Sequence, residues 1–447
     1  MRKFLLIFIV CLISIVSFSE FRELVFRSDE KTGLDIPQVF TFSELLDKFG
    51  EDFDANWYSL RIKDVNDKDI VYQITDMDSN DRISSDDLIS FCFKGEARLV
   101  VSDDFDMDVL HFDSNFEVLN DDDSYIVNNK NFSFKISNKG LISFISFDGN
   151  EGNIFNEIGT ARVAGWSGSS YYIDGKLGKH VENTSNGFSV KSLKVSDPGA
   201  VSISVKSVLT YDDLPGFNQE IVSTVFYTGD VVVNNKFYFT NYVDLMKLQV
   251  MATNPLLSMD DSSLHILPVF RRLVWAEQLG IRSVDYWKQR DSIKFFNDIP
   301  YIAFNAGEAN SPLWWGASYL FGSMENFRAN YSDKLNIAAV EILPTKPVVY
   351  SDFKKFIMGS SWMYESREFR DGFFRWMPDE FNLYEPTKGV FNGTSDQEIG
   401  DNLMMKFKAG DIVEFDRIYS VYGTKNVKNI FEFLNNRSLE IQSVTIK

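Results

Sequence analysis

The chain has 447 residues, with 45 Lys and Arg against 64 Asp and Glu, which gives a formal charge of −19. A hydrophobic fraction of 44 % over this length supplies enough apolar material for one to three packed domains and excludes a wholly disordered chain. Because the phosphate backbone of nucleic acids is itself anionic, the acidic balance argues against a nucleic-acid partner.

The first residues, 1–19, have the pattern of a secretory signal peptide. Two basic residues precede an apolar stretch over residues 4–13, and Ser17 and Ser19 are the small residues of a cleavage site. The apolar stretch is shorter than the roughly 20 residues that a membrane-spanning helix needs, and no second long apolar run follows. We therefore expect a secreted or periplasmic protein without an integral membrane segment after processing.

Cleavage changes both the charge and the cysteine content. Loss of Arg2 and Lys3 takes the net charge from −19 to −21. Loss of Cys11 leaves Cys92 as the single cysteine, so that a disulfide within the mature chain is excluded. Cys92 lies in an apolar, strand-like stretch, and we expect it to be a small buried hydrophobic residue.

Most of the mature sequence is typical of antiparallel strands. Apolar and polar residues alternate over 132–137, 201–206, 231–240 and 412–422, with many β-branched and aromatic side chains. Helical spacing of apolar residues occurs only over short stretches, at 42–49 and 427–434. The sequence therefore predicts an all-β protein with minor helices.

An acidic, polar stretch at residues 103–124 suggests a domain boundary. Residues 20–115 are expected to form a small N-terminal β-sandwich. Residues 120–447 are expected to form one large, multi-stranded β domain.

Residues 76–87 form the strongest local motif. Their spacing is that of a loop which wraps a calcium ion with oxygen ligands at positions 1, 3, 5, 7, 9 and 12. The residues at these positions are Asp76, Asp78, Asn80, Arg82 (through its backbone carbonyl), Ser84 and Asp87. We therefore predict a structural Ca²⁺ site in the N-terminal domain.

Two positions of this loop depart from the usual pattern. Position 6 is Asp81 instead of glycine, and position 12 is Asp87 instead of the longer glutamate. The flanking segments 69–75 and 88–93 have the composition of strands, so an EF-hand helix pair is not expected. The alternative is an acidic, solvated hairpin that binds no ion.

The N-terminal region as a whole resembles a family of exported bacterial β-sandwich proteins of unknown function. The resemblance is carried by the segments 24–28, 36–46, 60–64, 70–81 and 86–91, which include most of the acidic loop. In that family an Asp-x-Asp-x-Asp-Gly loop precedes a large domain similar to the mutarotase-like supersandwich, and the proteins occur beside enzymes that degrade polysaccharides. The resemblance implies a large β-supersandwich and a carbohydrate context, and it carries over no catalytic residue.

Tryptophan and arginine are concentrated between residues 265 and 380. Flat aromatic rings stack on sugar rings, and the guanidinium group pairs with carboxylates in a bidentate manner. The combination favours an acidic polysaccharide or oligosaccharide as partner. The candidate substrate-binding residues are Trp275, Trp287, Trp314, Trp315, Arg375 and Trp376.

Two reactions suit the residue types in this stretch. In a β-eliminating lyase, Arg272 or Arg290 would neutralise the uronate carboxylate, while His265 or Tyr286 would abstract the neighbouring proton. In a glycoside hydrolase, two carboxylates such as Glu277 with Asp379 or Glu380 would flank the bond. We favour lyase-like or related glycan cleavage.

A non-catalytic function is the competing interpretation. Aromatic residues in an all-β protein often form the core, and arginines often pair with nearby carboxylates. The alternative is therefore a glycan-binding or cell-envelope protein of the same architecture.

Overall fold

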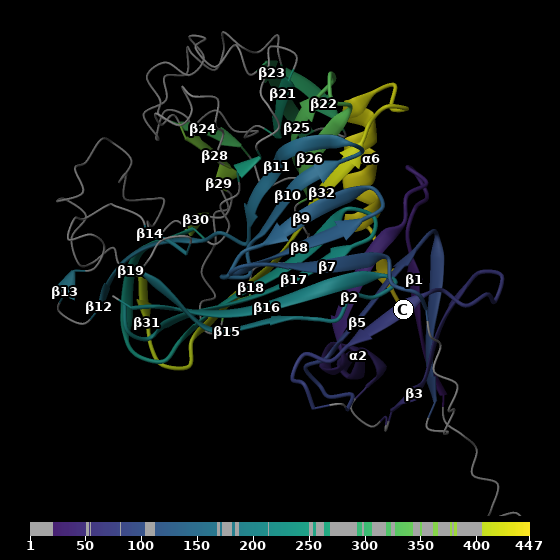
Figure 1. Ribbon diagram of the computed structural model, residues 1–447, viewed down its shortest axis with the longest axis horizontal. Helices are drawn as coiled ribbons and strands as arrows, with labels where there is room; N and C mark the ends of the chain where they lie inside the picture. Colours follow the sequence, from purple (N-terminus) through teal and green to yellow (C-terminus); the bar gives the residue numbers. More distant parts are fainter. Residues whose placement is uncertain are drawn as a thin grey trace, which may run out of the picture. The chain divides into compact units, whose positions relative to one another are not determined.

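The computed structural model is all-β with minor helices, which confirms the predicted fold class (Figure 1). The chain divides into two compact units: unit 1 contains Met1–Asp113 and Ser443–Lys447, and unit 2 contains Ser114–Gln442. Neither of the helices in the described part of the chain has the length and apolarity that a membrane crossing requires. The structure describes residues 21–50, 53, 55–80, 82–102, 112–167, 170–171, 181–183, 187–212, 214–249, 254–255, 263–268, 293–296, 299–305, 319–322, 327–342, 349–350, 361–364, 376–377, 380–381 and 405–447. The predicted signal peptide lies outside these residues.

Unit 1 consists of two sheets and one helix. Sheet A has the strand order β3-β6-β1-β33, and sheet B has the order β2-β5-β4. The elements are β1 (Phe21–Arg27), β2 (Ile36–Thr41), α2 (Phe42–Phe49), β3 (Asn56–Asp64), β4 (Tyr72–Thr75), β5 (Leu88–Phe93), β6 (Glu96–Ser102) and β33 (Thr445–Ile446).

Aromatic side chains hold the two sheets of unit 1 together. The ring of Phe26 on β1 lies 5.6 Å from that of Phe40 on β2 and 5.2 Å from that of Phe91 on β5, measured between ring centroids. Such tilted and edge-on arrangements add to the hydrophobic free energy of burial. Cys92 is buried in the same strand as Phe91, as the sequence predicts.

The short strand β33 completes sheet A from the other end of the chain. It pairs with β1 in an antiparallel manner, with Phe26 opposite Ile446. Val25 and Lys447 also exchange two backbone hydrogen bonds, of 2.8 and 3.1 Å. Residues 443–447 thus belong to unit 1, although they follow unit 2 in the sequence.

Unit 2 is built around two large sheets. Sheet C has the order β20-β11-β10-β9-β8-β7, and sheet E is eleven-stranded over the described residues, with the path β15-β16-β17-β18-β32-β26-β25-β21-β23-β22 and β27 beside β32. Sheet D is formed by β12, β13, β14, β19, β30 and β31, and sheet F by β24, β28 and β29.

The strands and the helix of unit 2 have the following bounds: β7 (Phe116–Asp121), β8 (Ser124–Asn129), β9 (Phe132–Ile136), β10 (Ile142–Phe147), β11 (Asn150–Ile158), β12 (Arg162–Ser167), β13 (Ser170–Tyr171), β14 (Val181–Glu182), β15 (Phe188–Val195), β16 (Ser202–Tyr211), β17 (Phe217–Phe226), β18 (Asp230–Phe239), β19 (Val243–Gln249), β20 (Asn254–Pro255), β21 (Ser263–Pro268), β22 (Ile293–Phe296), β23 (Ile299–Asn305), β24 (Tyr319–Gly322), β25 (Phe327–Ser332), β26 (Ile337–Ile342), β27 (Val349–Tyr350), β28 (Ser361–Tyr364), β29 (Trp376–Met377), β30 (Glu380–Phe381), β31 (Met405–Phe407), β32 (Ile412–Gly423) and α6 (Ile430–Gln442).

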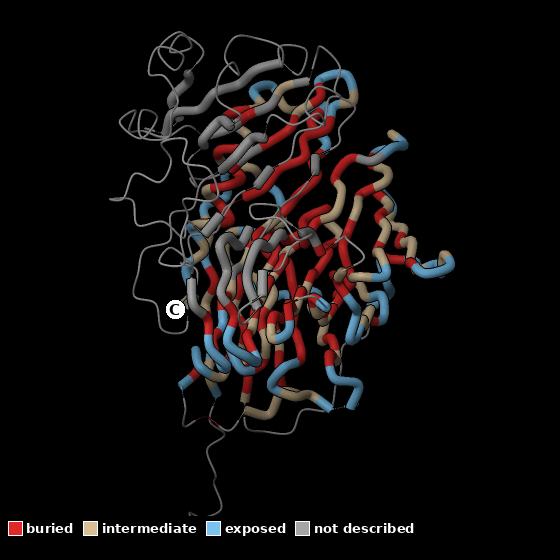
Figure 2. The backbone as a smooth tube through the Cα atoms, turned by 90° about the vertical axis from the view of Figure 1, so that its left-hand side faces the viewer, coloured by how far each residue is buried: buried red, intermediate tan, exposed pale blue. Residues whose placement is uncertain are grey.

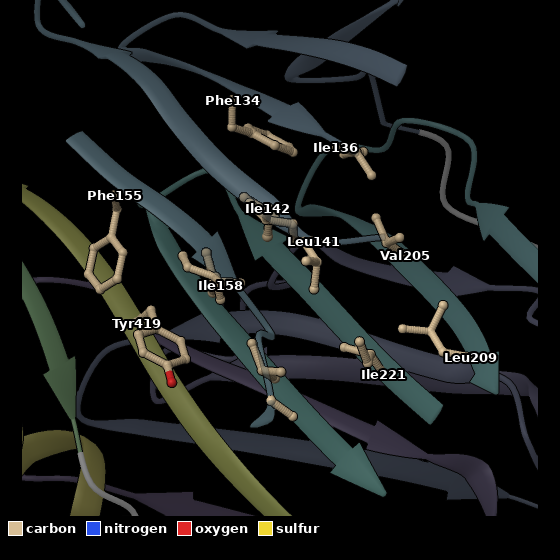
Figure 3. Close-up of a cluster of buried hydrophobic side chains, with 14 of the residues drawn as sticks. Phe134, Ile136, Leu141, Ile142, Phe155, Ile158, Val205, Leu209, Ile221 and Tyr419 are labelled. Atoms are coloured by element: carbon tan, nitrogen blue, oxygen red, sulfur yellow. The ribbon is translucent and has the colours of Figure 1, made fainter. Parts of the chain in front are cut away.

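The core of unit 2 lies between sheets C and E. Ile142 and Ile158 of sheet C face Ile221 of sheet E, and all three side chains are buried (Figure 3). Figure 2 shows that the buried segments follow the strands and that exposure is concentrated at the turns. The alternating apolar residues therefore form the buried face of each strand, which is turned towards the other sheet.

A buried ion pair fixes α6 to sheet E. The carboxylate of Asp230, at the start of β18, accepts a hydrogen bond of 2.9 Å from Arg437 of α6. It also accepts hydrogen bonds from Tyr422 (2.6 Å), Thr228 (2.7 Å) and Ser420. Burial raises the pKa of Tyr422 above its usual value, so this phenol stays protonated over a wide pH range.

Candidate metal centre in the N-terminal unit

The loop of residues 76–87 connects β4 to β5, and the ladder between these strands determines where its two ends lie. The last pair of the ladder is Thr75 opposite Leu88. Asp76 and Asp87 follow immediately outside this pair, so the two carboxylates at opposite ends of the loop are brought together.

Three carboxylates of this loop surround one point. Asp76, Asp78 and Asp87 each offer one oxygen, and these oxygens lie within 4.8 Å of one another. Oxygens on opposite sides of a calcium ion, each about 2.4 Å from it, are about 4.8 Å apart. A single Ca²⁺ could therefore contact all three, and it would relieve the repulsion between their negative charges.

Asp87 is the buried member of the group. Its side chain is 0 % exposed, and its two carboxylate oxygens accept backbone hydrogen bonds from Met77 (2.6 Å) and Ser84 (2.7 Å). None of the ion pairs among the described residues involves Asp87. Because a buried carboxylate without a cationic partner is unfavourable, this position favours a bound cation.

Ser84 offers a further oxygen to the loop. Its hydroxyl oxygen is buried and has no hydrogen-bond partner within the described part of the chain. The hydrogen bond from the Ser84 N–H to Asp87 places this residue beside the buried carboxylate. A buried hydroxyl without a partner is uncommon, and a metal ion would use its lone pair.

The middle of the loop is ordered by its own side chains. Asp76 Oδ1 accepts hydrogen bonds from the backbone N–H groups of Asp78 and Ser79, and Ser79 has a positive φ of 62°. Asn80 Oδ1 accepts a hydrogen bond of 2.7 Å from the N–H of Arg82, and a second lone pair on that oxygen could bind an ion. The carbonyl of Arg82 is the main-chain ligand that the spacing predicts, while Asp81 lies outside the described residues.

The loop is also attached to helix α2. The N–H of Phe42 donates to the carbonyl of Asp87 (3.1 Å), and the N–H of Ser43 donates to that of Ser85 (3.0 Å). A reciprocal pair of hydrogen bonds between Thr41 and Glu44 caps the same helix. The start of α2 is therefore connected through the main chain to the predicted metal ligands.

The candidate residues of the large domain are described only in part. His265 lies in β21, opposite Asn330 of β25 and Phe304 of β23. Trp376 lies in β29, opposite Met363 of β28, and Glu380 lies in β30. The remaining candidates lie outside the described residues: Arg272, Trp275, Glu277, Tyr286, Trp287, Arg290, Trp314, Trp315, Arg375 and Asp379.

The sequence did not predict a second set of buried polar residues, which lies on the core-facing side of sheet E. These residues are Gln219, Asn235, Glu341 and Arg417. In the sequence, these residues could be recognised as polar side chains at positions where the alternation predicts an apolar one.

Comparison with known proteins identifies neither a matching family model nor a matching curated protein. Among solved structures, an α-mannosidase from Enterococcus faecalis V583 matches 95 % of this chain at 9 % identity and a TM-score of 0.43. Galactose 1-epimerase from Lactobacillus acidophilus NCFM matches 69 % at 9 % identity and a TM-score of 0.31. The periplasmic domain of Thermotoga maritima YidC matches 69 % at 9 % identity and a TM-score of 0.23.

The share of the solved chain that is covered differs among the three structures. The matched region covers 46 % of the mannosidase chain, 98 % of the epimerase chain and 87 % of the YidC domain. At these identities and TM-scores, no property of the three proteins is assigned to the present chain.

Proposed function

We propose that this chain is an exported carbohydrate-active protein that cleaves acidic polysaccharide in a lyase-like reaction, and that a bound Ca²⁺ stabilises its unit 1. The calcium site has the strongest geometric support, carried by the three carboxylate oxygens that lie within 4.8 Å of one another. The glycan activity is supported by the residue types between positions 265 and 380.

The proposed role of Ca²⁺ is structural. The ion would hold Asp76 and Asp87 together at the end of the β4–β5 ladder, and it would neutralise the buried charge of Asp87. Since the ion binds the folded loop and not the unfolded chain, it stabilises unit 1 by mass action. The gain is about 2.7 kcal/mol at a free concentration one hundred times Kd.

Calcium titration of the full chain tests this role. Ca²⁺ should raise Tm, and chelation should lower it and speed amide hydrogen exchange in peptides from residues 72–93. Asp78→Asn should weaken the calcium response, because Asp78 is an exposed predicted ligand, and the remaining side-chain oxygen of Asn can still accept the hydrogen bond from the Asn80 N–H. Asp47→Asn, an exposed position of α2 outside the loop, is the matched control. An identical Tm with Ca²⁺ and with chelator would refute the site.

The proposed glycan reaction is a β-elimination. An arginine, Arg272 or Arg290, would neutralise the uronate carboxylate and so acidify the proton on the adjacent ring carbon. His265 or Tyr286 would take that proton, a carbon–carbon double bond would form, and the glycosidic C–O bond would break. A tyrosine would protonate the leaving oxygen.

A panel of polyuronates and neutral polysaccharides separates the possibilities. Lyase activity produces an unsaturated, ultraviolet-absorbing sugar, whereas hydrolysis releases reducing ends without that absorbance. His265→Ala should abolish the lyase product, and His111→Ala is the matched control. Retention of glycan without cleavage would favour the non-catalytic binder, and neither retention nor cleavage would refute a carbohydrate function.

The mass of the secreted protein tests export. A mature chain that begins at Glu20 is expected after expression with its native N-terminus. A full-length chain that is retained inside the cell would contradict the proposal.

A further inference from the structure

Helix α2 is too short to be stable by itself. It has eight residues, whereas isolated helices shorter than about 12–15 residues are marginal in water. Its stability must therefore come from the groups that cap its ends and from the apolar face that it buries. Both of these can be followed from α2 to neighbouring parts of unit 1.

The loop of residues 76–87, here called the calcium loop, caps the start of α2. The first N–H groups of a helix have no partner within the helix. In α2 the N–H of Phe42 donates to the carbonyl of Asp87 (3.1 Å), and the N–H of Ser43 donates to the carbonyl of Ser85 (3.0 Å). Two donors that the capping box of α2 does not use are thus satisfied by the calcium loop.

Asp87 connects the predicted ion to the helix. Its carboxylate accepts hydrogen bonds from the N–H groups of Met77 and Ser84, and its carbonyl accepts the hydrogen bond from Phe42. The side chain that would bind the ion and the carbonyl that caps α2 therefore belong to one residue. The position of this residue determines whether both interactions can be made.

The three carboxylates are the part of this arrangement that depends on the ion. Oxygens of Asp76, Asp78 and Asp87 lie within 4.8 Å of one another, so their negative charges repel. A cation would remove this repulsion and would also bind the hydroxyl of Ser84, whose oxygen is buried and has no hydrogen-bond partner among the described residues. Without a cation, the energy of the loop falls when the carboxylates separate.

The apolar face of α2 packs against an aromatic side chain of β3. Phe42, Leu45 and Phe49 are at most 6 % exposed. The ring of Trp57 lies 4.7 Å from that of Phe42 and 6.3 Å from that of Phe49, measured between centroids. The next tryptophan in the sequence is Trp166, in unit 2. Trp57 is therefore a fluorescent reporter of the contact between α2 and β3.

We infer that the bound ion controls the docking of α2 on β3. With Ca²⁺ in the loop, the two carbonyls cap the helix and its apolar face covers Trp57. Without the ion, the carboxylates separate, the caps are lost and the short helix opens locally, because it has no other partners for its first N–H groups. This inference rests on the proposed calcium site and adds a conformational switch to its structural role.

Reciprocity distinguishes such a switch from a purely local effect of the ion on its loop. If Ca²⁺ stabilises the docked helix, a change that weakens the helix must weaken calcium binding by the same factor. A helix that is docked with and without the ion produces no such effect. The calcium affinity of a variant with a weaker α2 therefore tests the coupling directly.

Fluorescence and amide hydrogen exchange of the full chain measure docking. Addition of CaCl₂ after chelation should change the tryptophan emission and slow exchange in residues 42–49. Strand β17 of unit 2 is the internal reference, and its exchange should not respond. Trp57→Phe keeps an aromatic ring against Phe42, so it should remove the change in emission and retain the calcium-dependent rise in Tm.

Thr41→Ala weakens the helix without changing a predicted ligand. It removes the hydroxyl that accepts the hydrogen bond from the N–H of Glu44. The calcium affinity measured by calorimetry should fall about two- to fivefold, the factor that corresponds to loss of a helix cap. Asp47→Asn, at an exposed position of the same helix outside the cap, is the matched control. Its calcium affinity should equal that of the unmodified chain.

Each outcome has a definite meaning. Slower exchange in residues 42–49 with Ca²⁺, an emission change that requires Trp57, and weaker calcium binding in Thr41→Ala support the inference. If Ca²⁺ raises Tm while the exchange of residues 42–49 stays the same, or if Thr41→Ala binds calcium like the unmodified chain, the inference is overturned and the proposed calcium site stands. If the unmodified chain shows neither calcium binding nor a change in Tm, both are overturned.

Discussion

Replacing Asp230 by Asn tests how strongly the buried ion pair holds α6 on sheet E. Asn preserves the shape of the side chain but removes the charge that compensates Arg437, and both side chains are at most 1 % exposed. Removal of one partner from a buried ion pair typically costs about 3–5 kcal/mol.

The contacts around Arg437 refine this magnitude. At the 2.9 Å between Asp230 and Arg437, the Coulomb attraction is about 6 kcal/mol for an effective dielectric constant of about 20. Glu440 lies 3.8 Å from the same guanidinium and retains part of the compensation in the variant. We therefore expect the lower end of the range, a loss of about 3 kcal/mol in the free energy of unfolding.

A double-mutant cycle with Arg437→Met provides the assay. Urea unfolding gives the loss in free energy, and hydrogen exchange of α6 gives a local value, because a chain with two units need not unfold in one step. The double variant contains neither charge of the pair and should be more stable than Arg437→Met alone, which leaves the buried Asp230 carboxylate without its guanidinium partner. A loss below about 1 kcal/mol in Asp230→Asn, or strictly additive losses in the double variant, would refute the reasoning.

Three further predictions concern stability. Burial raises the pKa of Tyr422, so the phenol keeps its proton in the folded state at pH values where the unfolded chain loses it. The free energy of unfolding should therefore fall as the pH rises above about 10. Tyr422→Phe should make the urea midpoint less dependent on pH in that range. Gly140→Ala puts a Cβ 2.6 Å from Ser207 Cβ, whereas Gly149→Ala, at the same φ of 78°, meets nothing within 4 Å. The free energy of unfolding of Gly140→Ala should therefore be about 1–3 kcal/mol lower than that of Gly149→Ala. Equal free energies of unfolding in the two variants would contradict the clash. Thr41→Ala removes the cap of α2 and should cost about 1 kcal/mol, read as faster exchange in residues 42–49.

The local elements could be predicted from the sequence because their signals are local. The alternation over 412–422 corresponds to β32, and the stretch 42–49 corresponds to α2, whose Thr41 and Glu44 have the spacing of a capping box. The spacing that predicts a metal site is equally local, since all the predicted ligands lie in one continuous loop. These features need no knowledge of how distant strands pair.

Features that depend on strand order could not be predicted in the same way. Gln219, Asn235, Glu341 and Arg417 become neighbours only through the registers of four strands, and Glu341 comes from a strand far from the others in sequence. The pairing of β33 with β1 has no local signal at all, because two residues are too few to show a pattern.

That pairing has a consequence for the order of folding during synthesis. β1 is made early, but its neighbour β33 is made only after the whole of unit 2. Until then the end of β1 at residues 25–27 lacks its pairing strand, and its free N–H and C=O groups are a template for association with other chains. A ribosome-bound chain therefore has an incomplete unit 1, and a chaperone that covers this strand would protect it in the interval.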